Sequence, residues 1–154
     1  MSLAIQNQLM DAYLAEIQAA FADLSNGYSQ RPVTYRRMCP PLPLLRSDFK
    51  PAVYLWCGDQ PKDQVSTRRQ RNQLEINVIG VATCVAEEQE RVGIEFVADL
   101  ESILIVANAR VVDGVACDTA AKGSVVWNAN AMPEMAGGHF QAIVTYQTRL
   151  GNPR

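Results

Sequence analysis

The stretch "LEINVIGVA", Leu74 to Ala82, decides the fold because its apolar side chains recur at every second position. A period of two residues is typical of a β-strand, whose successive side chains point to opposite faces of a sheet. The second set of positions begins polar and turns apolar, so we expect this strand to become buried on both faces as it proceeds. One face carries Leu74, Ile76, Val78, Gly80 and Ala82, and the other carries Glu75, Asn77, Ile79 and Val81.

Two segments of helical period flank this strand in the sequence. Residues 3–24 and 86–107 repeat apolar side chains at steps of three and four, which predicts two amphipathic helices. Gly93 lies inside the second segment and predicts a bend or a late start there. The predicted buried positions are Ile5, Leu9, Tyr13, Ile17, Phe21 and Leu24 in the first helix, and Val92, Phe96, Leu100, Ile103 and Ala107 in the second.

The remaining segments predict further strands joined by loops. Residues 51–58 and 139–150 are the clearest strands, and shorter ones are expected within 109–117 and 123–128, with a loop through "MPEMAGG" at 132–138. Five prolines break residues 28–51, where only "VTYRRM" at 33–38 predicts a short edge strand. The sequence therefore predicts one α+β domain over residues 1–154, with a mostly antiparallel sheet of about four to five strands and two helices on one face.

Composition argues against several functional classes. The net charge is −2 and no apolar run approaches the roughly 18 residues of a membrane helix, so neither a membrane nor specific nucleic acid is an expected partner. The four cysteines form no CxxC pair and there is one histidine, so we expect buried thiols in a reducing compartment and no metal. Nothing in the start of the chain resembles a secretory signal, which predicts a cytoplasmic origin.

Motifs of catalysis are not found either. The chain contains no phosphate-binding loop, dinucleotide fingerprint or nucleophile elbow. His139 is the one conventional general base, and the simpler interpretation is that it is an ordinary strand histidine. The alternative is that a residue close in space, such as Ser124, acts with it as a nucleophile. We therefore expect no catalytic residue and no cofactor.

Two charged segments are candidates for an interface. Lys62, Arg68, Arg69 and Arg71 give residues 59–73 a basic character, and we call this segment the basic arm, which we expect to project from the sheet as a hairpin. The alternatives for the basic arm are a solvated loop, a nucleic-acid stripe and a protein-binding surface. Glu88, Glu95 and Asp99 lie on the second helix, where the alternatives are a solvated face, a catalytic carboxylate pair and an interface.

Several phrases of the chain resemble one family of viral proteins. The leading helix, the proline-rich segment, "PAVYLWCGDQPKDQ", "LEINVIGVAT", "VADLESIL" and the final "AIVTYQT" occur in an order that resembles the tail terminator proteins of long-tailed bacteriophages, also called minor tail or tail completion proteins. The resemblance covers most of the chain, although residues 111–137 match nothing in it. It implies an α+β fold and an architectural role, with no catalytic residues to transfer.

The resemblance also implies a set of partners and a location. Tail terminators form a hexameric ring on the end of the tail tube, stop its polymerisation and present a surface to the neck of the head. The implied partners are other copies of the chain, the major tail tube protein and a neck or head completion protein, in a virion tail assembled in the host cytoplasm. The alternatives are a neck or head–tail joining protein of the same particle and, from a different class, a small hydrolase or ligand-binding domain.

Overall fold

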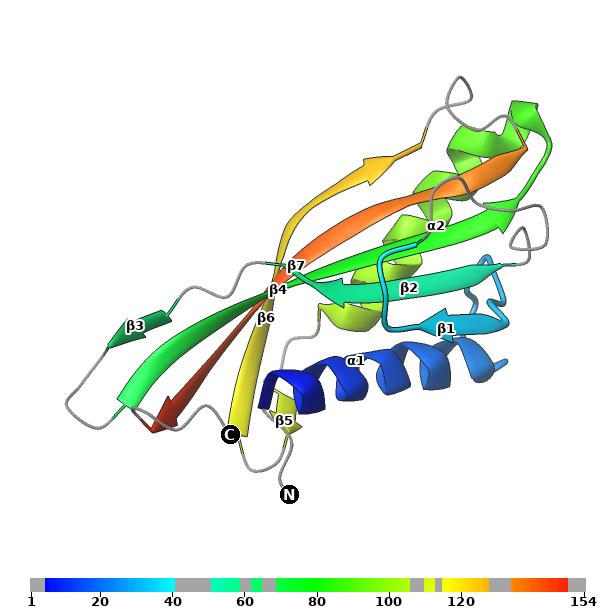
Figure 1. The fold of residues 1–154 in the computed structure, drawn as a ribbon. Coiled ribbons are helices and arrows are strands. Elements are labelled where there is room, and N and C mark those ends of the chain that lie inside the picture. The colour runs from blue at the N-terminus through cyan, green and yellow to red at the C-terminus, as the bar shows by residue number, and fades with distance from the viewer. Residues whose placement is uncertain are drawn as a thin grey trace.

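One sheet with two helices on the same side makes up the fold in the computed structural model (Figure 1), which describes residues 5–40, 51–58, 62–64, 69–105, 110–112, 115–127 and 134–149. Within these residues the strand order is β1-β2-β4-β7-β6-β5, and β3 pairs with β4 beyond the end of β2. Only β1 and β2 are parallel neighbours. The predicted α+β class with a mostly antiparallel sheet is confirmed. The described residues form seven strands instead of the expected four to five, and three of the seven, β1, β3 and β5, have only three residues each. The elements are α1 (Ile5–Ala22), β1 (Thr34–Arg36), β2 (Ala52–Cys57), β3 (Lys62–Gln64), β4 (Arg69–Thr83), a 3₁₀ turn (Ala86–Glu88), α2 (Gln89–Leu104), β5 (Arg110–Val112), β6 (Val115–Val126) and β7 (Met135–Arg149).

The central strand β4 has the two faces that its sequence predicts. Leu74, Ile76 and Val78 are fully buried against the helices. On the opposite face Glu75 is half-buried, whereas Val81 is fully buried in a smaller cluster with Tyr54. The strand therefore does change from half-buried to buried on both faces along its length.

The two helices cover one face of the sheet with the apolar stripes read from the sequence. The buried residues of α1 include Ile5, Leu9, Tyr13, Ile17 and Phe21, and those of α2 include Val92, Phe96, Leu100 and Ile103. Leu24 was also expected in the first stripe, but it follows the end of α1 and is 81% exposed. The second helix ends at Leu104, because the backbone of Ile105 is already extended. The predicted end of this helix at Ala107 is therefore too late in the chain. Residues 106–109 lie outside the described residues.

Phe96 of α2 lies directly over Gly80 of β4. A Cβ atom added to Gly80 would come within 2.6 Å of the Phe96 ring, so only glycine leaves room for that ring. The same ring packs edge-on against Phe21 of α1, with centroids 5.9 Å apart. One aromatic side chain therefore joins both helices to the centre of the sheet.

The predicted loop over residues 132–138 is partly wrong, because β7 already begins at Met135. Gly137 has a φ of 152°, and a Cβ there would lie 1.9 Å from the Gly80 carbonyl oxygen. The two adjacent glycines suggested a loop, but Gly137 serves the close approach of two paired strands. Residues 128–133 lie outside the described residues.

The projecting basic arm is not confirmed. Arg69 and Arg71 belong to β4 and pair in register with Arg149 and Gln147 of β7, while Lys62 belongs to β3. Figure 1 shows β3 and this end of β4 lying away from α2. Parts of the basic arm lie outside the described residues, namely residues 59–61 and 65–68, which include Arg68.

The proline-rich segment is described in part. Its predicted edge strand near Thr34 is confirmed as β1, whereas residues 41–50 lie outside the described residues.

We expect Gly80→Ala to lower the free energy of unfolding by about 1–3 kcal/mol, because the added methyl group displaces the Phe96 ring from a packed core. Gly123→Ala is the matched control, since a Cβ at Gly123 meets nothing within 4 Å, and it should change stability by less than about 0.5 kcal/mol. Urea denaturation of the two variants measures the difference. Equal stabilities would contradict the proposed packing of Phe96 on Gly80.

Candidate functional site

Polar side chains form a row across the face of the sheet that the helices leave uncovered, and we call it the polar row: Glu75, Asn77, Lys122, His139 and Gln141. Lys122 Nζ lies 2.6 Å from Glu75 Oε2, and Gln141 Nε2 donates to Asn77 Oδ1 over 2.9 Å. His139 Nε2 is 2.8 Å from the same amide oxygen. An amide oxygen only accepts hydrogen bonds, so His139 carries its proton on Nε2. The polar row thus ties β4, β7 and β6 together through side chains.

A bulge in β6 positions the lysine of this row. Ala121 lies opposite Ala142 and Gly123 lies opposite Gln141, so Lys122 is the extra residue between two register pairs. A bulge changes the direction in which a side chain points. Lys122 consequently reaches across the whole of β7 to Glu75 on β4.

The environment shifts the pKa values of two members of the polar row. The hydrogen bond from Lys122 is the main reason that the pKa of Glu75 lies below its usual value. Burial lowers the pKa of His139, and the indole of Trp56 stacks on the imidazole with ring centroids 5.5 Å apart. The lowered pKa of Glu75 favours its charged carboxylate near pH 7, and the lowered pKa of His139 favours its neutral imidazole.

The polar row is arranged as a structural network. Its side chains hydrogen-bond to one another, and Ser124 lies opposite Phe140 in the register, on the other face of the sheet from His139. The pairing of Ser124 with His139 that the sequence left open is therefore wrong. Among the described residues no three histidine, cysteine, aspartate or glutamate side chains are grouped as metal ligands.

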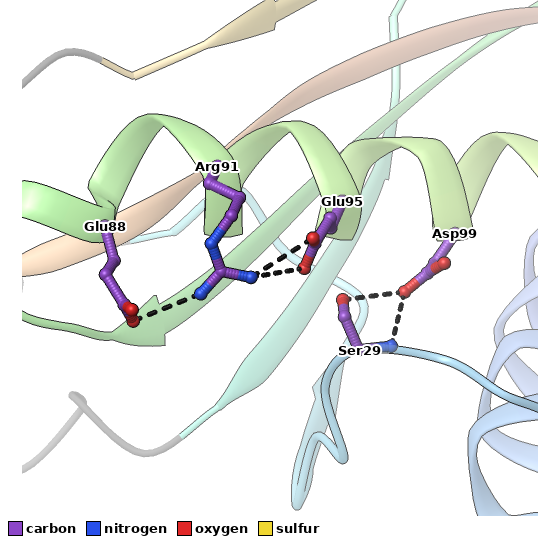
Figure 2. A network of polar contacts seen from close by, with 5 residues as sticks. All are labelled: Ser29, Glu88, Arg91, Glu95 and Asp99. Atoms are coloured by element: carbon purple, nitrogen blue, oxygen red, sulfur yellow. Dashed lines mark hydrogen bonds and ion pairs between the residues drawn. The ribbon is translucent and has the colours of Figure 1, made fainter.

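The acidic residues Glu95 and Asp99 lie on α2 as the sequence predicted, while Glu88 ends the 3₁₀ turn before it, and all three have partners within the subunit. Arg91 lies between Glu88 and Glu95, with a 3.2 Å N–O distance to each (Figure 2). Asp99 accepts two hydrogen bonds of 2.9 Å from the backbone and hydroxyl of Ser29. A neighbouring subunit that used these carboxylates would therefore compete with Arg91 and Ser29.

The basic positions gather at the end of the sheet where β3, β4 and β7 meet. In the backbone register Arg69 faces Arg149, and Lys62 faces Asn72 next to Arg71. Arg149 was not singled out in the sequence, because only the pairing of β4 with β7 brings it to Arg69. Figure 1 shows this end of the sheet at the opposite side from the start of α2.

The outer part of β6 is poorly covered by the rest of the described chain. β5 pairs only with Val115 to Cys117, so among the described strands residues 118–126 have a neighbour on one side alone. Residues 120–125 are all exposed, including the apolar side chain of Val125 at 63%. Residues 120–125 therefore meet solvent on both faces of the sheet.

No protein-family model matches this chain, and no curated protein is significantly similar to it in sequence. Within the described residues neither helix combines the length and the apolar character needed to cross a bilayer.

Protonation of His139 should destabilise the fold. Its folded pKa lies below 6.5, so the unfolded chain binds the proton more readily and stability falls as the pH drops through that value. Urea denaturation at about pH 7.5 and about pH 5.5 measures this loss, because histidine is the side chain that titrates in this window. His139→Gln should reduce the pH dependence. A variant with the same pH dependence as the natural chain would assign the effect to other groups.

Proposed function

We propose that this protein is a structural subunit of a bacteriophage tail, which assembles as a ring on the end of the tail tube and stops its growth. The ring would then offer its outer surface to the neck or head of the particle. The observation that carries the proposal is the stretch of residues 120–125 in β6, whose side chains are exposed on both faces of the sheet. The resemblance of the sequence to tail terminators supports the same role.

An exposed edge strand is unusual in a protein that acts alone. Unpaired backbone groups along an edge recruit other strands, so monomers usually shorten, cover or charge their edges. Residues 118–126 have a single bulge at Lys122, whose ammonium group is already engaged with Glu75. A closed ring removes such edges by placing each against the next subunit.

The chemistry of the uncovered face supports a binding role over a catalytic one. His139 and Asn77 are bonded to each other, and Glu75 is bonded to Lys122, so these groups hold the strands in place. We infer that the protein acts by assembly, without an enzymatic step and without a cofactor. The alternative is a neck or head–tail joining subunit, which would also act by assembly but would bind a different partner.

Incubation of the purified protein with tail tubes tests the proposal. We expect a six-fold ring at one end of each tube in electron micrographs, and tubes that no longer elongate when free tube subunits are added. A ring that binds neck structures but leaves elongation unchanged would favour the joining role. Tubes that carry no copy of the protein, or a different stoichiometry, would contradict the proposal.

The basic arm should contribute to assembly and little to folding. We expect the Arg68→Ala, Arg69→Ala, Arg71→Ala triple variant to keep a nearly unchanged melting temperature, since exposed charge pairs contribute only about 0.2–1 kcal/mol each. Ring formation or tube capping should weaken, most clearly at low salt, where exposed charges attract over longer distances.

The comparison of melting temperature with capping separates the two roles. Normal capping by the triple variant would remove the assembly role of the basic arm. A large loss of monomer stability would show that these arginines pack within their own subunit.

A further inference from the structure

The two sides of α2 that border its buried stripe differ in how far the subunit itself uses them. On the side next to Ser29, Arg91 pairs with Glu88 and Glu95, and Asp99 accepts two hydrogen bonds from Ser29 (Figure 2). Another molecule that bound on this side would have to compete with those partners. The other side of the helix is therefore the better candidate for a contact between subunits.

The other side of α2 carries Glu90, Ile94 and Glu101, and we call it the acidic flank. At 100° per residue these positions lie within about 40° of one another around the helix axis. Glu90 and Glu101 are exposed, and neither forms a hydrogen bond or an ion pair with another residue that the structure describes. Ile94 is 50% exposed. The acidic flank thus combines an exposed apolar side chain with two carboxylates that the subunit does not use.

The acidic flank lies on the side of α2 that is turned towards β6. The ring of Phe96 lies over β4, and a Cβ atom on Gly93 would meet Val126 of β6. The direction around the helix from Phe96 to Gly93 therefore runs across the sheet towards β6, and Glu90 lies further in the same direction. In the strand order β6 and β1 are on opposite sides of β4. The acidic flank is consequently on the far side of the subunit from β1.

The β1 side of the subunit carries an exposed cation. Arg36, the last residue of β1, is exposed and has no hydrogen-bond or ion-pair partner among the residues that the structure describes. Met38, which follows it, is 41% exposed. Arginine and methionine are both enriched where proteins bind each other. Every other lysine or arginine whose side chain is described has an interaction within the subunit, namely Arg31, Arg37, Arg71, Arg91 and Lys122.

Opposite charges on opposite sides of one subunit favour a head-to-tail contact. A second copy in the same orientation would turn its β1 side towards the acidic flank of the first. A contact between like sides would instead bring two copies of Glu90, or two copies of Arg36, close together, and like charges disfavour it. Head-to-tail contacts close into rings or continue as filaments.

The spacing of the side chains selects the residues that meet. Glu90 and Ile94 are one helical turn apart, which is about 6 Å along the axis. Arg36 and Met38 are two residues apart, which is at most about 7 Å of chain. An arginine placed at Glu90 therefore brings Met38 close to Ile94. Glu101 lies about 16 Å from Glu90 along the axis, so it adds only attraction over a longer distance.

We propose that the acidic flank of one copy of this chain binds the β1 side of a second copy, with Arg36 of the second copy paired to Glu90 and its Met38 packed on Ile94. This inference rests on the proposed ring and names the surfaces that join its subunits. The guanidinium group can bind a carboxylate through two parallel hydrogen bonds, which fixes the orientation of the two copies.

Charge reversal tests the pairing. We expect Glu90→Arg and Arg36→Glu each to weaken self-association of the full chain about tenfold or more, since each places like charges together. The double variant should recover most of the loss, because the pair is restored with exchanged signs. Asp118→Arg is the matched control, since Asp118 is an exposed carboxylate of β6 away from the acidic flank, and it should assemble normally. Sedimentation velocity over a concentration series measures assembly, and circular dichroism checks that each monomer is folded.

An apolar variant gives an independent readout of the same contact. Ile94→Ser should weaken self-association about fivefold through the loss of buried apolar area, and it should change monomer stability little because Ile94 is half exposed. Rings that form normally from the single variants, or a double variant as impaired as the single ones, would overturn this inference and leave the proposed function standing. A natural chain that forms no ring, free or on tail tubes, would overturn both.

Discussion

The pairing of β4 with β7 over fifteen residues is the constraint on which the rest of the structure depends. Both strands lie in the middle of the sheet order, and each supplies alternate side chains to the core beneath α1 and α2. Gly137 allows the close approach of the two strands, and Gly80 leaves room for the Phe96 ring, which packs on Phe21 of α1. The register of this pair also brings Asn77 beside Gln141 and thereby builds the polar row.

Uneven coverage of the sheet follows from this arrangement. Two helices are enough to cover β4 and β7 on one face, but they leave the outer residues of β6 exposed on both faces. Most side chains there are small or polar, as in Ala121 and Gly123, although Val125 is apolar and exposed.

The charged groups divide into those that the subunit uses itself and those that it leaves free. Arg91 neutralises Glu88 and Glu95, and Lys122 neutralises Glu75, so these pairs support the fold locally. Asp118 and Arg36 have no such partner among the described residues.

The sequence by itself determined the two helices and the central strand, since the period of two over Leu74 to Ala82 and the period of about 3.6 in the two helices are local properties of the chain. It also placed β2 and most of β7 correctly. Tertiary structure alone decided which residues neighbour each other across the sheet. It determined that Lys122 reaches Glu75, that Ser124 is separated from His139, and that Gly137 belongs to a strand. Each of these depends on strand order, register and one bulge, which arise from pairing between segments far apart in the sequence, so no local pattern encodes them.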